Sequence, residues 1–186
     1  MSPTSHNAII EGFHHTPIVA ETTWIFGLSG AGKTTFANEL CKVSRHRLLC
    51  LDGDIVRGGL SKDLGFTSKD RALNIERVSH VAKMANDQGI SCLVSMITPT
   101  RKLRALAKNI IGPERVRFIW INTPKEVCVE RDHKGLYVRF TEMLKEADAF
   151  EEPELKEELS MCFSTQTSSI EDLAILAAGY ALRFGI

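Results

Sequence analysis

Residues 27–34 read Gly-Leu-Ser-Gly-Ala-Gly-Lys-Thr and match the pattern G-x-x-x-x-G-K-[ST] of phosphate-binding loops. Glycines let such a loop curl until successive backbone N–H groups point at phosphate oxygens, and the helix that follows favours an anion at its N-terminus. Lys33 would reach the β- and γ-phosphates of a nucleoside triphosphate, and the Thr34 hydroxyl would ligate Mg²⁺. The predicted nucleotide-binding residues of this loop are Gly27, Ser29, Gly30, Ala31, Gly32, Lys33, Thr34 and Thr35.

Two carboxylates follow the next apolar segment. Asp52 and Asp54 flank Gly53, where a strand expected over residues 47–51 ends. Because ligands of parallel sheets bind at the carboxyl ends of the strands, these carboxylates would face the phosphate loop. One of them can hold Mg²⁺ through water or polarise an acceptor hydroxyl, whereas the alternative is an Asp-Gly turn that caps a helix.

Side chains suited to a second anion come next in the chain. Arg57 lies three residues beyond Asp54, and Arg71 and Asn74 share one face of an expected long helix. A guanidinium can bind a phosphate or sulfate through two parallel hydrogen bonds, although each arginine alone is equally consistent with a solvated surface charge. The chain has no N-K-x-D motif of the kind that reads guanine, which argues against a GTPase.

The elements that must position these residues are an alternation of strands and helices. Expected strands cover residues 22–26, 47–51, 90–97 and 117–121. Expected helices cover residues 33–43, a long stretch capped by Thr67 and Asp70 and stopped by Gly89, residues 99–110, a stretch after Pro124, and residues 169–182. The strand over 90–97 is almost continuously apolar, as is typical of a strand buried on both faces of a parallel sheet. The pattern predicts an α/β fold of three αβα layers around a parallel sheet, as in P-loop kinases.

Length and composition limit the alternatives. A chain of 186 residues favours one domain, which we expect over residues 21–186, with a loose arm over 1–20 and a charged lid over about 133–153. Lysine plus arginine and aspartate plus glutamate both number 23, so the formal net charge is zero. That balance argues against a general nucleic-acid or membrane-surface partner.

The cysteines and the apolar runs suggest a compartment. The chain has five cysteines, an odd number, and no C-x-x-C spacing, so neither a disulfide scaffold nor a zinc framework is indicated. The first residues lack the basic and apolar parts of a signal peptide, and no apolar run approaches the roughly 20 residues that span a bilayer. We therefore expect reduced thiols, no membrane partner and a cytoplasmic location.

Beyond these physical arguments, residues 51–89 resemble the adenylylsulfate kinases, which phosphorylate adenosine 5′-phosphosulfate. The family pattern L-D-G-D-x-x-R-x-G-L-x-x-D-L-G-F, followed by D-R-x-x-N-I-x-R, is met here in order. The loop GLSGAGKTT at 27–35, the run ITPTR at 97–101 and the run RDHKGLY at 131–137 are similar to the family as well. The resemblance covers about residues 20–175.

The resemblance implies roles for individual residues. It implies ATP as the phosphoryl donor with Mg²⁺ as cofactor, a small-molecule nucleotide as acceptor, and a homodimer. The catalytic residues would be Lys33, Asp54 and Thr98, and the metal ligands would be Thr34 and Asp54. Asp54 would also meet the ribose 3′-hydroxyl. The remaining substrate-binding residues would be Arg57, Arg71 and Asn74 at the phosphosulfate, Phe66 at the substrate adenine, and Ile97, Thr98 and Lys134 around the same pocket. Arg131 would cover the adenine of ATP.

The chain departs from the family in two places. The family's Ser-Pro-Tyr after the third strand is Thr98-Pro99-Thr100, which keeps a hydroxyl and loses an aromatic ring. That serine is sometimes described as a phosphoenzyme intermediate, but direct in-line transfer needs no protein nucleophile. After Tyr137 the segment is shorter than in the family and lacks the Phe-Thr-Gly-Ile-Asp loop over the substrate. The segment is also rich in acidic residues, which either face solvent or indicate that the phosphoryl acceptor is a different molecule. Phe140 or Phe150 either replaces the missing aromatic ring or has an ordinary packing role.

Three functions are consistent with these residues. The first is an adenylylsulfate kinase that makes 3′-phosphoadenosine 5′-phosphosulfate. The second is a related P-loop kinase acting on another nucleotidyl or small hydroxyl substrate, for example in capsule polysaccharide modification, and the altered lid favours it. The third is a non-catalytic domain that senses such nucleotides. The intact Lys33, Thr34 and Asp54 argue for catalysis.

Overall fold

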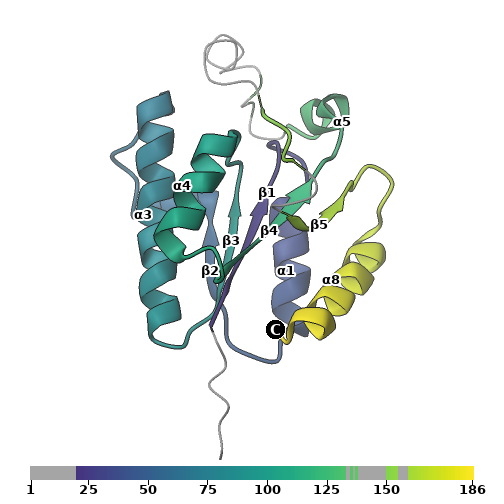
Figure 1. Ribbon diagram of the computed structural model, residues 1–186. Helices are drawn as coiled ribbons and strands as arrows, with labels where there is room; N and C mark the ends of the chain where they lie inside the picture. The colour runs from purple at the N-terminus through teal and green to yellow at the C-terminus, as the bar shows by residue number, and fades with distance from the viewer. Residues whose placement is uncertain (1–19, 133–134, 136, 138–149, 155–158) are drawn as a thin grey trace, which may run out of the picture.

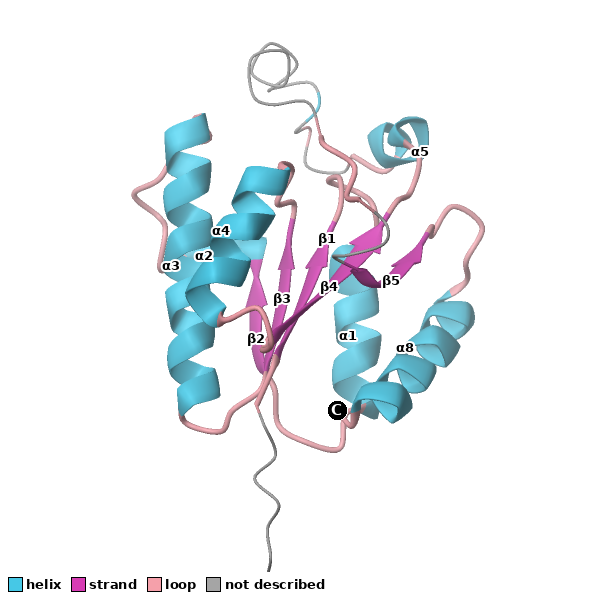
Figure 2. Ribbon diagram, in the orientation of Figure 1, coloured by secondary structure: helices cyan, strands magenta, loops and turns pink. Residues whose placement is uncertain are grey.

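The computed structural model describes residues 20–132, 135, 137, 150–154 and 159–186. Its five strands form one parallel sheet in the order β2-β3-β1-β4-β5. The strands are β1 (Thr22–Phe26), β2 (Leu49–Asp52), β3 (Cys92–Met96), β4 (Val116–Ile121) and β5 (Leu159–Phe163). Figure 2 shows them in magenta, with their carboxyl ends at one edge. Functional groups that follow different strands therefore meet at this edge.

Helices cover both faces of the sheet. Helices α1 (Lys33–Val43) and α8 (Ile170–Phe184) pair on one face, and α3 (Ser68–Asp87) and α4 (Arg101–Ile111) pair on the other (Figure 1). Two short helices, α2 (Gly53–Gly58) and α5 (Lys125–Glu130), follow β2 and β4. The expected three-layer αβα fold is confirmed. Within the described segments, no helix is long and apolar enough to cross a membrane.

Strand alternation divides the interior into two cores. In β1, Trp24 and Phe26 belong to the cluster under α3 and α4, whereas Ile25 belongs to the cluster with α1 and α8. All residues of β1 and β3 are buried. This is the reason why the strand around residues 90–97 reads as a continuous apolar run, since both of its faces are covered.

Helix caps place the boundaries that the sequence predicts. The Thr67 hydroxyl accepts a hydrogen bond from the Asp70 amide at 3.1 Å and donates one to the Asp70 carboxylate at 2.8 Å, so the predicted capping pair is confirmed. Helix α4 starts slightly later than expected, at Arg101, because Thr100 is its N-cap and accepts from the Leu103 amide at 3.2 Å.

The structure contains two elements that the sequence does not predict, α2 and β5. Helix α2 forms in a glycine-containing segment with low helix propensity, because Asp52 caps it and Val56 is buried in the core. Strand β5 is a half-exposed edge strand, and a register shift interrupts its pairing with β4. Its five residues therefore carry a weak periodic signal, and pairing with β4 decides its conformation.

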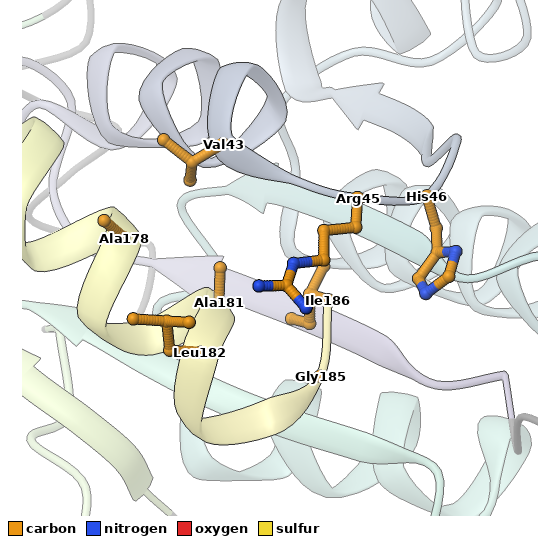
Figure 3. A pocket seen from close by; sticks show the side chains of 8 residues that line it. All are labelled: Val43, Arg45, His46, Ala178, Ala181, Leu182, Gly185 and Ile186. Carbon is orange, nitrogen blue, oxygen red and sulfur yellow. The ribbon is translucent and has the colours of Figure 1, made fainter.

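A surface hollow of about 330 Å³ lies between the C-terminal ends of α1 and α8 (Figure 3). Its lining includes Val43 and Arg45 from the end of α1 and the loop after it, and Leu182 and Ile186 near the end of the chain. Because Lys33 stands at the opposite end of α1, this hollow is not the phosphate site.

Candidate active site

The phosphate loop joins the end of β1 to the start of α1, and its backbone needs glycine. Gly27 and Gly30 have φ angles of 151° and 76°. A Cβ atom at Gly27 would clash with the Ile121 carbonyl oxygen, and one at Gly30 would lie 2.6 Å from the Cys128 carbonyl oxygen. Both the left-handed conformation and the close backbone contacts exclude a larger residue at these positions. The loop thus has the shape that its sequence predicts.

The lysine and threonine of the motif begin α1. Lys33 curls back over the loop, where its ammonium group donates to the Leu28 carbonyl at 2.6 Å. Within the described structure no side chain caps α1 and its first turn carries no acid. The start of α1 therefore combines a cation with helix N–H groups, an arrangement that favours a bound phosphate.

Asp52 contacts the phosphate loop. The Asp52 carboxylate accepts hydrogen bonds from the hydroxyl groups of Thr34 at 2.8 Å and Ser95 at 2.7 Å. Asp54 lies exposed in the first turn of α2. The roles implied for Asp54 in metal binding and catalysis stay a prediction. Ser95 is not among the predicted residues, although a lone hydroxyl within the apolar strand β3 is a usable signal.

The contacts of Asp52 favour its charged form. Desolvation pushes the pKa of Asp52 upward, but hydrogen bonds from Ser95, Thr34 and the amides of Asp54 and Ile55 outweigh it. The pKa of Asp52 is therefore lower than that of an ordinary aspartate. A carboxylate held this way beside the Thr34 hydroxyl offers the oxygen ligands that Mg²⁺ prefers.

A second cationic group lies after α2. The Arg57 guanidinium stands 4.3 Å from the centre of the Phe66 ring and donates to the Gly65 carbonyl at 2.8 Å. Arg71 donates to the Phe66 carbonyl at 2.9 Å. Desolvation first, and then the nearby charge of Arg71, lower the pKa of Arg57. The nearby charges of Asp70 and Asp54 act in the opposite direction. An added anion would be attracted to the two guanidinium groups, so this cluster is suited to a phosphate or sulfate.

Asn74 belongs to the same region of α3. Its side chain is buried, and its Oδ1 atom has no hydrogen-bond partner among the described residues. A buried amide oxygen without a partner is costly, and a donor on a ligand would satisfy it. Phosphosulfate oxygens only accept hydrogen bonds, so the contact that the resemblance implies would use the Asn74 amide nitrogen, and the Oδ1 atom would need another donor, such as a substrate hydroxyl.

Ile97 and Thr98 extend from β3 to the phosphate loop. The Ile97 carbonyl accepts from the Gly27 amide at 3.3 Å. Thr98 has a φ of 41°, which strains a β-branched residue by about 1–3 kcal/mol. Its buried hydroxyl accepts from the Trp24 indole at 2.9 Å, and its carbonyl accepts from Arg104 at 3.3 Å. These two contacts hold Thr98 in the strained conformation.

Comparisons with known proteins identify the family of this chain. The family model described as adenylylsulphate kinase matches residues 19–157. The chain belongs to the adenylylsulfate kinase family. The adenylyl-sulfate kinases of Halothermothrix orenii and Paraburkholderia xenovorans are 50% and 44% identical over 121 and 119 residues, covering 63% and 62% of this chain. The bifunctional enzyme NodQ of Rhizobium meliloti is 44% identical over 144 residues, or 71% of this chain.

The match spans 64%, 66% and 22% of the length of these three relatives, which is less than two thirds of each. Among solved structures, the Mycobacterium tuberculosis APS kinase CysC in complex with AMPPNP and APS is 30% identical, with a TM-score of 0.73. That alignment covers 90% of this chain and 98% of the mycobacterial one. The resemblance inferred from short motifs is thus confirmed at the level of the family and the fold.

Arg131 is linked to the phosphate loop by hydrogen bonds that run through Thr165, in the loop after β5. Arg131 donates to the hydroxyl and the carbonyl of Thr165 at 2.8 and 3.0 Å. Thr165 and Thr123 in turn donate to the Ala31 carbonyl at 2.9 and 3.1 Å. Sequence reasoning missed both threonines, since single threonines in loops carry no spacing signal.

The family's KGLY run is only partly described. Tyr137 donates its hydroxyl to the Ser29 carbonyl of the phosphate loop at 2.8 Å. Desolvation, and then nearby acidic groups, raise the pKa of the Tyr137 phenol, so it remains a donor at neutral pH. Lys134 lies outside the described residues, as do residues 1–19 and most of the expected lid.

Residues 150–154 clarify part of the unusual acidic segment. Phe150 packs with near-parallel rings against Phe26 and Trp120, at centroid distances of 6.3 and 6.4 Å. This favours the ordinary packing role for Phe150. The Glu151 and Glu154 carboxylates accept hydrogen bonds from the backbone amide and the side chain of Arg101, at 2.8 and 2.6 Å. Glu154 is therefore paired with a cation of α4, and Glu151 accepts a hydrogen bond at the start of that helix.

Proposed function

We propose that this chain transfers the γ-phosphoryl group of ATP to the 3′-hydroxyl of adenosine 5′-phosphosulfate. One observation carries the proposal, the presence of two cationic centres at the same edge of the sheet. Lys33 stands on the phosphate loop, and Arg57 and Arg71 stand around Phe66 after β2. The first suits a triphosphate and the second suits an acceptor that carries its own anionic group.

On the donor side, the loop amides and Lys33 would hold the triphosphate and stabilise charge on the transferring phosphoryl group. We propose that Thr34 and Asp52 hold the Mg²⁺ ion, which neutralises phosphate charge when bound. The 2.8 Å contact between their side chains supports this pairing. Ser95 would keep the Asp52 carboxylate oriented.

On the acceptor side, Asp54 would face the ribose hydroxyl and accept its hydrogen bond, since it follows Asp52 at the start of α2. Arg57, Arg71 and Asn74 would bind the phosphosulfate, and Phe66 would pack on the adenine. Ile97, Thr98 and Lys134 would line the same pocket. Arg131 would lie near the adenine of ATP.

A coupled assay of ADP release tests the proposal. Purified protein with Mg-ATP should release ADP rapidly with adenosine phosphosulfate and slowly with other nucleotides, sugars and small alcohols. The Lys33→Ala variant serves as a background control. Turnover with another acceptor alone would favour the second kinase function, and binding without turnover of any acceptor would favour the sensor.

Calorimetry in the presence of ADP and Mg²⁺ gives an independent readout. We expect adenosine phosphosulfate to bind with a Kd tighter than about 10 μM, near −7 kcal/mol. No binding at millimolar ligand would overturn the proposed acceptor. The Mg²⁺ requirement is tested in the same titration by chelation.

We also propose a cytoplasmic location and a homodimer. All five cysteines are free, which supports a reducing compartment. The homodimer rests on the family resemblance, and light scattering of the purified chain would test it.

A further inference from the structure

Two cysteines that the proposed reaction does not use lie against each other. Cys41 belongs to the last turns of α1 and Cys50 to strand β2. Their sulfur atoms are 3.0 Å apart, and both residues are exposed. A disulfide needs a sulfur–sulfur distance of about 2.05 Å, so a shift of roughly 1 Å would bring the two atoms into bonding range.

The surroundings of the pair are open and basic. A surface hollow of about 350 Å³ is lined by Cys41, Cys50, Leu48, His46 and Arg47. A small thiol reagent can therefore reach the sulfurs, and the Arg47 cation would attract an anionic reagent. The other exposed cysteine, Cys162, lies on β5 at the opposite edge of the sheet from β2.

Metal binding is the competing chemistry for two adjacent thiols. Structural zinc sites take four protein ligands. No cluster of three potential His, Cys, Asp or Glu ligands occurs among the residues that the structure describes. The geometry therefore favours oxidation of the pair over coordination.

We propose that Cys41 and Cys50 form a reversible dithiol–disulfide site that reacts with low-molecular-weight disulfides such as oxidised glutathione. The bridge would join α1, which starts with the phosphate-binding residues, to β2, which ends in Asp52. The proposal does not depend on the proposed kinase activity, because it concerns thiol chemistry alone.

The exchange balances without another reactant. The Cys50 thiolate attacks one sulfur of the glutathione disulfide, forms a mixed disulfide and releases one glutathione thiolate, which takes up a proton. Cys41 then loses its proton, attacks the Cys50 sulfur and releases the second glutathione. Two protein thiols are oxidised and one glutathione disulfide is reduced to two thiols.

The order of attack follows from the state of Cys41. Desolvation of its sulfur, and then the hydrogen bond and charge of Cys50, raise the pKa of Cys41 to about 12. Cys41 is therefore protonated at neutral pH and is a poor initial nucleophile. Once Cys50 is in a mixed disulfide its charge is gone, so Cys41 is easier to ionise for the second step.

The test equilibrates the full chain with oxidised glutathione, quenches it with acid and measures intact mass and tryptic peptides. Lys42, Arg45 and Arg47 lie between the two cysteines, so trypsin separates them and a bridge appears as two linked peptides. We expect that linked pair with a loss of two hydrogen atoms, and glutathione retained on Cys162. Added reduced glutathione should reverse both products.

Three variants provide matched controls. Cys41→Ser and Cys50→Ser should lose the linked peptides and retain glutathione on the remaining cysteine, whereas Cys162→Ser should keep the bridge. Buried Cys92 and Cys128 should stay unmodified in each folded variant. The proposal is overturned if the wild type keeps glutathione on Cys41 or Cys50 without linked peptides, or if both stay free thiols while Cys162 reacts.

Discussion

The phosphate loop and residues 150–154 lie at the same edge of the sheet but are held there by different means. The loop is shaped by its own glycines and by the helix that follows it. Residues 150–154 depend on Arg101 and Arg104, about fifty positions earlier in the chain. The Glu151 amide also donates to the Pro99 carbonyl at 2.8 Å.

This difference explains why one region diverges while the other keeps its motif. A loop whose shape comes from neighbouring residues tolerates few changes, since a Cβ at Gly27 or Gly30 meets backbone atoms. A segment held by side-chain contacts to a distant helix can change in length and charge if those contacts remain. The loss of the family's aromatic loop is thus compatible with an intact phosphate site.

The largest expected effect is in the phosphate loop. Lys33→Ala should lower kcat by about 10²–10³-fold, because the ammonium group stabilises charge in the transition state. The unfolding midpoint should change little, since Lys33 is only partly buried. Steady-state ADP release and urea unfolding measure the two effects. A variant that keeps more than about a tenth of the wild-type kcat would remove Lys33 from the catalytic residues.

The two carboxylates after β2 give the next effect. Asp52→Asn should weaken Mg-ATP binding and lower kcat by about tenfold to a hundredfold, because it removes the charge beside Thr34. Asp54→Asn should lower kcat while leaving the KM for Mg-ATP nearly unchanged, because its proposed contact is the acceptor hydroxyl. Mg²⁺ titrations of both variants separate the roles. If Asp54→Asn alone changes the Mg²⁺ dependence, the metal assignment belongs to Asp54 instead.

Sequence reasoning performs well where structure is local. Residues 27–35, the Thr67–Asp70 cap and the apolar strand β3 each carry a pattern set by near neighbours, and each was predicted. The contact between Asp52 and Ser95 joins residues 43 positions apart in the sequence, which strand pairing brings together. Strand β5 likewise depends on β4. Contacts of this kind are decided by topology, which no local spacing records.

Ser95 offers a smaller, pH-dependent effect. Ser95→Ala removes a hydrogen bond to the Asp52 carboxylate, so the pKa of Asp52 should rise towards that of an ordinary aspartate. A carboxyl group whose pKa is lowered by folding stabilises the fold at pH values above its unfolded-state pKa. That stabilisation is lost as the pH falls through the folded-state pKa. Ser95→Ala should therefore cost about 1 kcal/mol at neutral pH and progressively less at acid pH.

Urea unfolding of Ser95→Ala across the acid range measures this, with Ser79→Ala as the matched control. Ser79 is also a buried serine, but its hydroxyl donates at 2.7 Å to the neutral Ile75 carbonyl. The stability lost in Ser79→Ala should therefore be independent of pH. Equal and pH-independent losses in both variants would show that Ser95 does not tune Asp52.

The smallest effect belongs to residues 150–154. Arg101 donates to the Glu152 carbonyl at 3.0 Å and the Glu154 carboxylate at 2.6 Å, and its side chain is half exposed. Exposed ion pairs contribute about 0.2–1 kcal/mol, so Arg101→Ala should lower the free energy of unfolding by less than about 1 kcal/mol.

Hydrogen exchange at the Glu151 amide should nevertheless quicken, because the segment loses two of its contacts to α4. Arg115→Ala, which removes an exposed ion pair with Asp87 elsewhere, should leave that amide unchanged. If exchange is unchanged in Arg101→Ala, the packing of Phe150 against Phe26 and Trp120 holds the segment instead. The phosphate loop would then differ from residues 150–154 because aromatic packing, and not charged side chains, holds the latter.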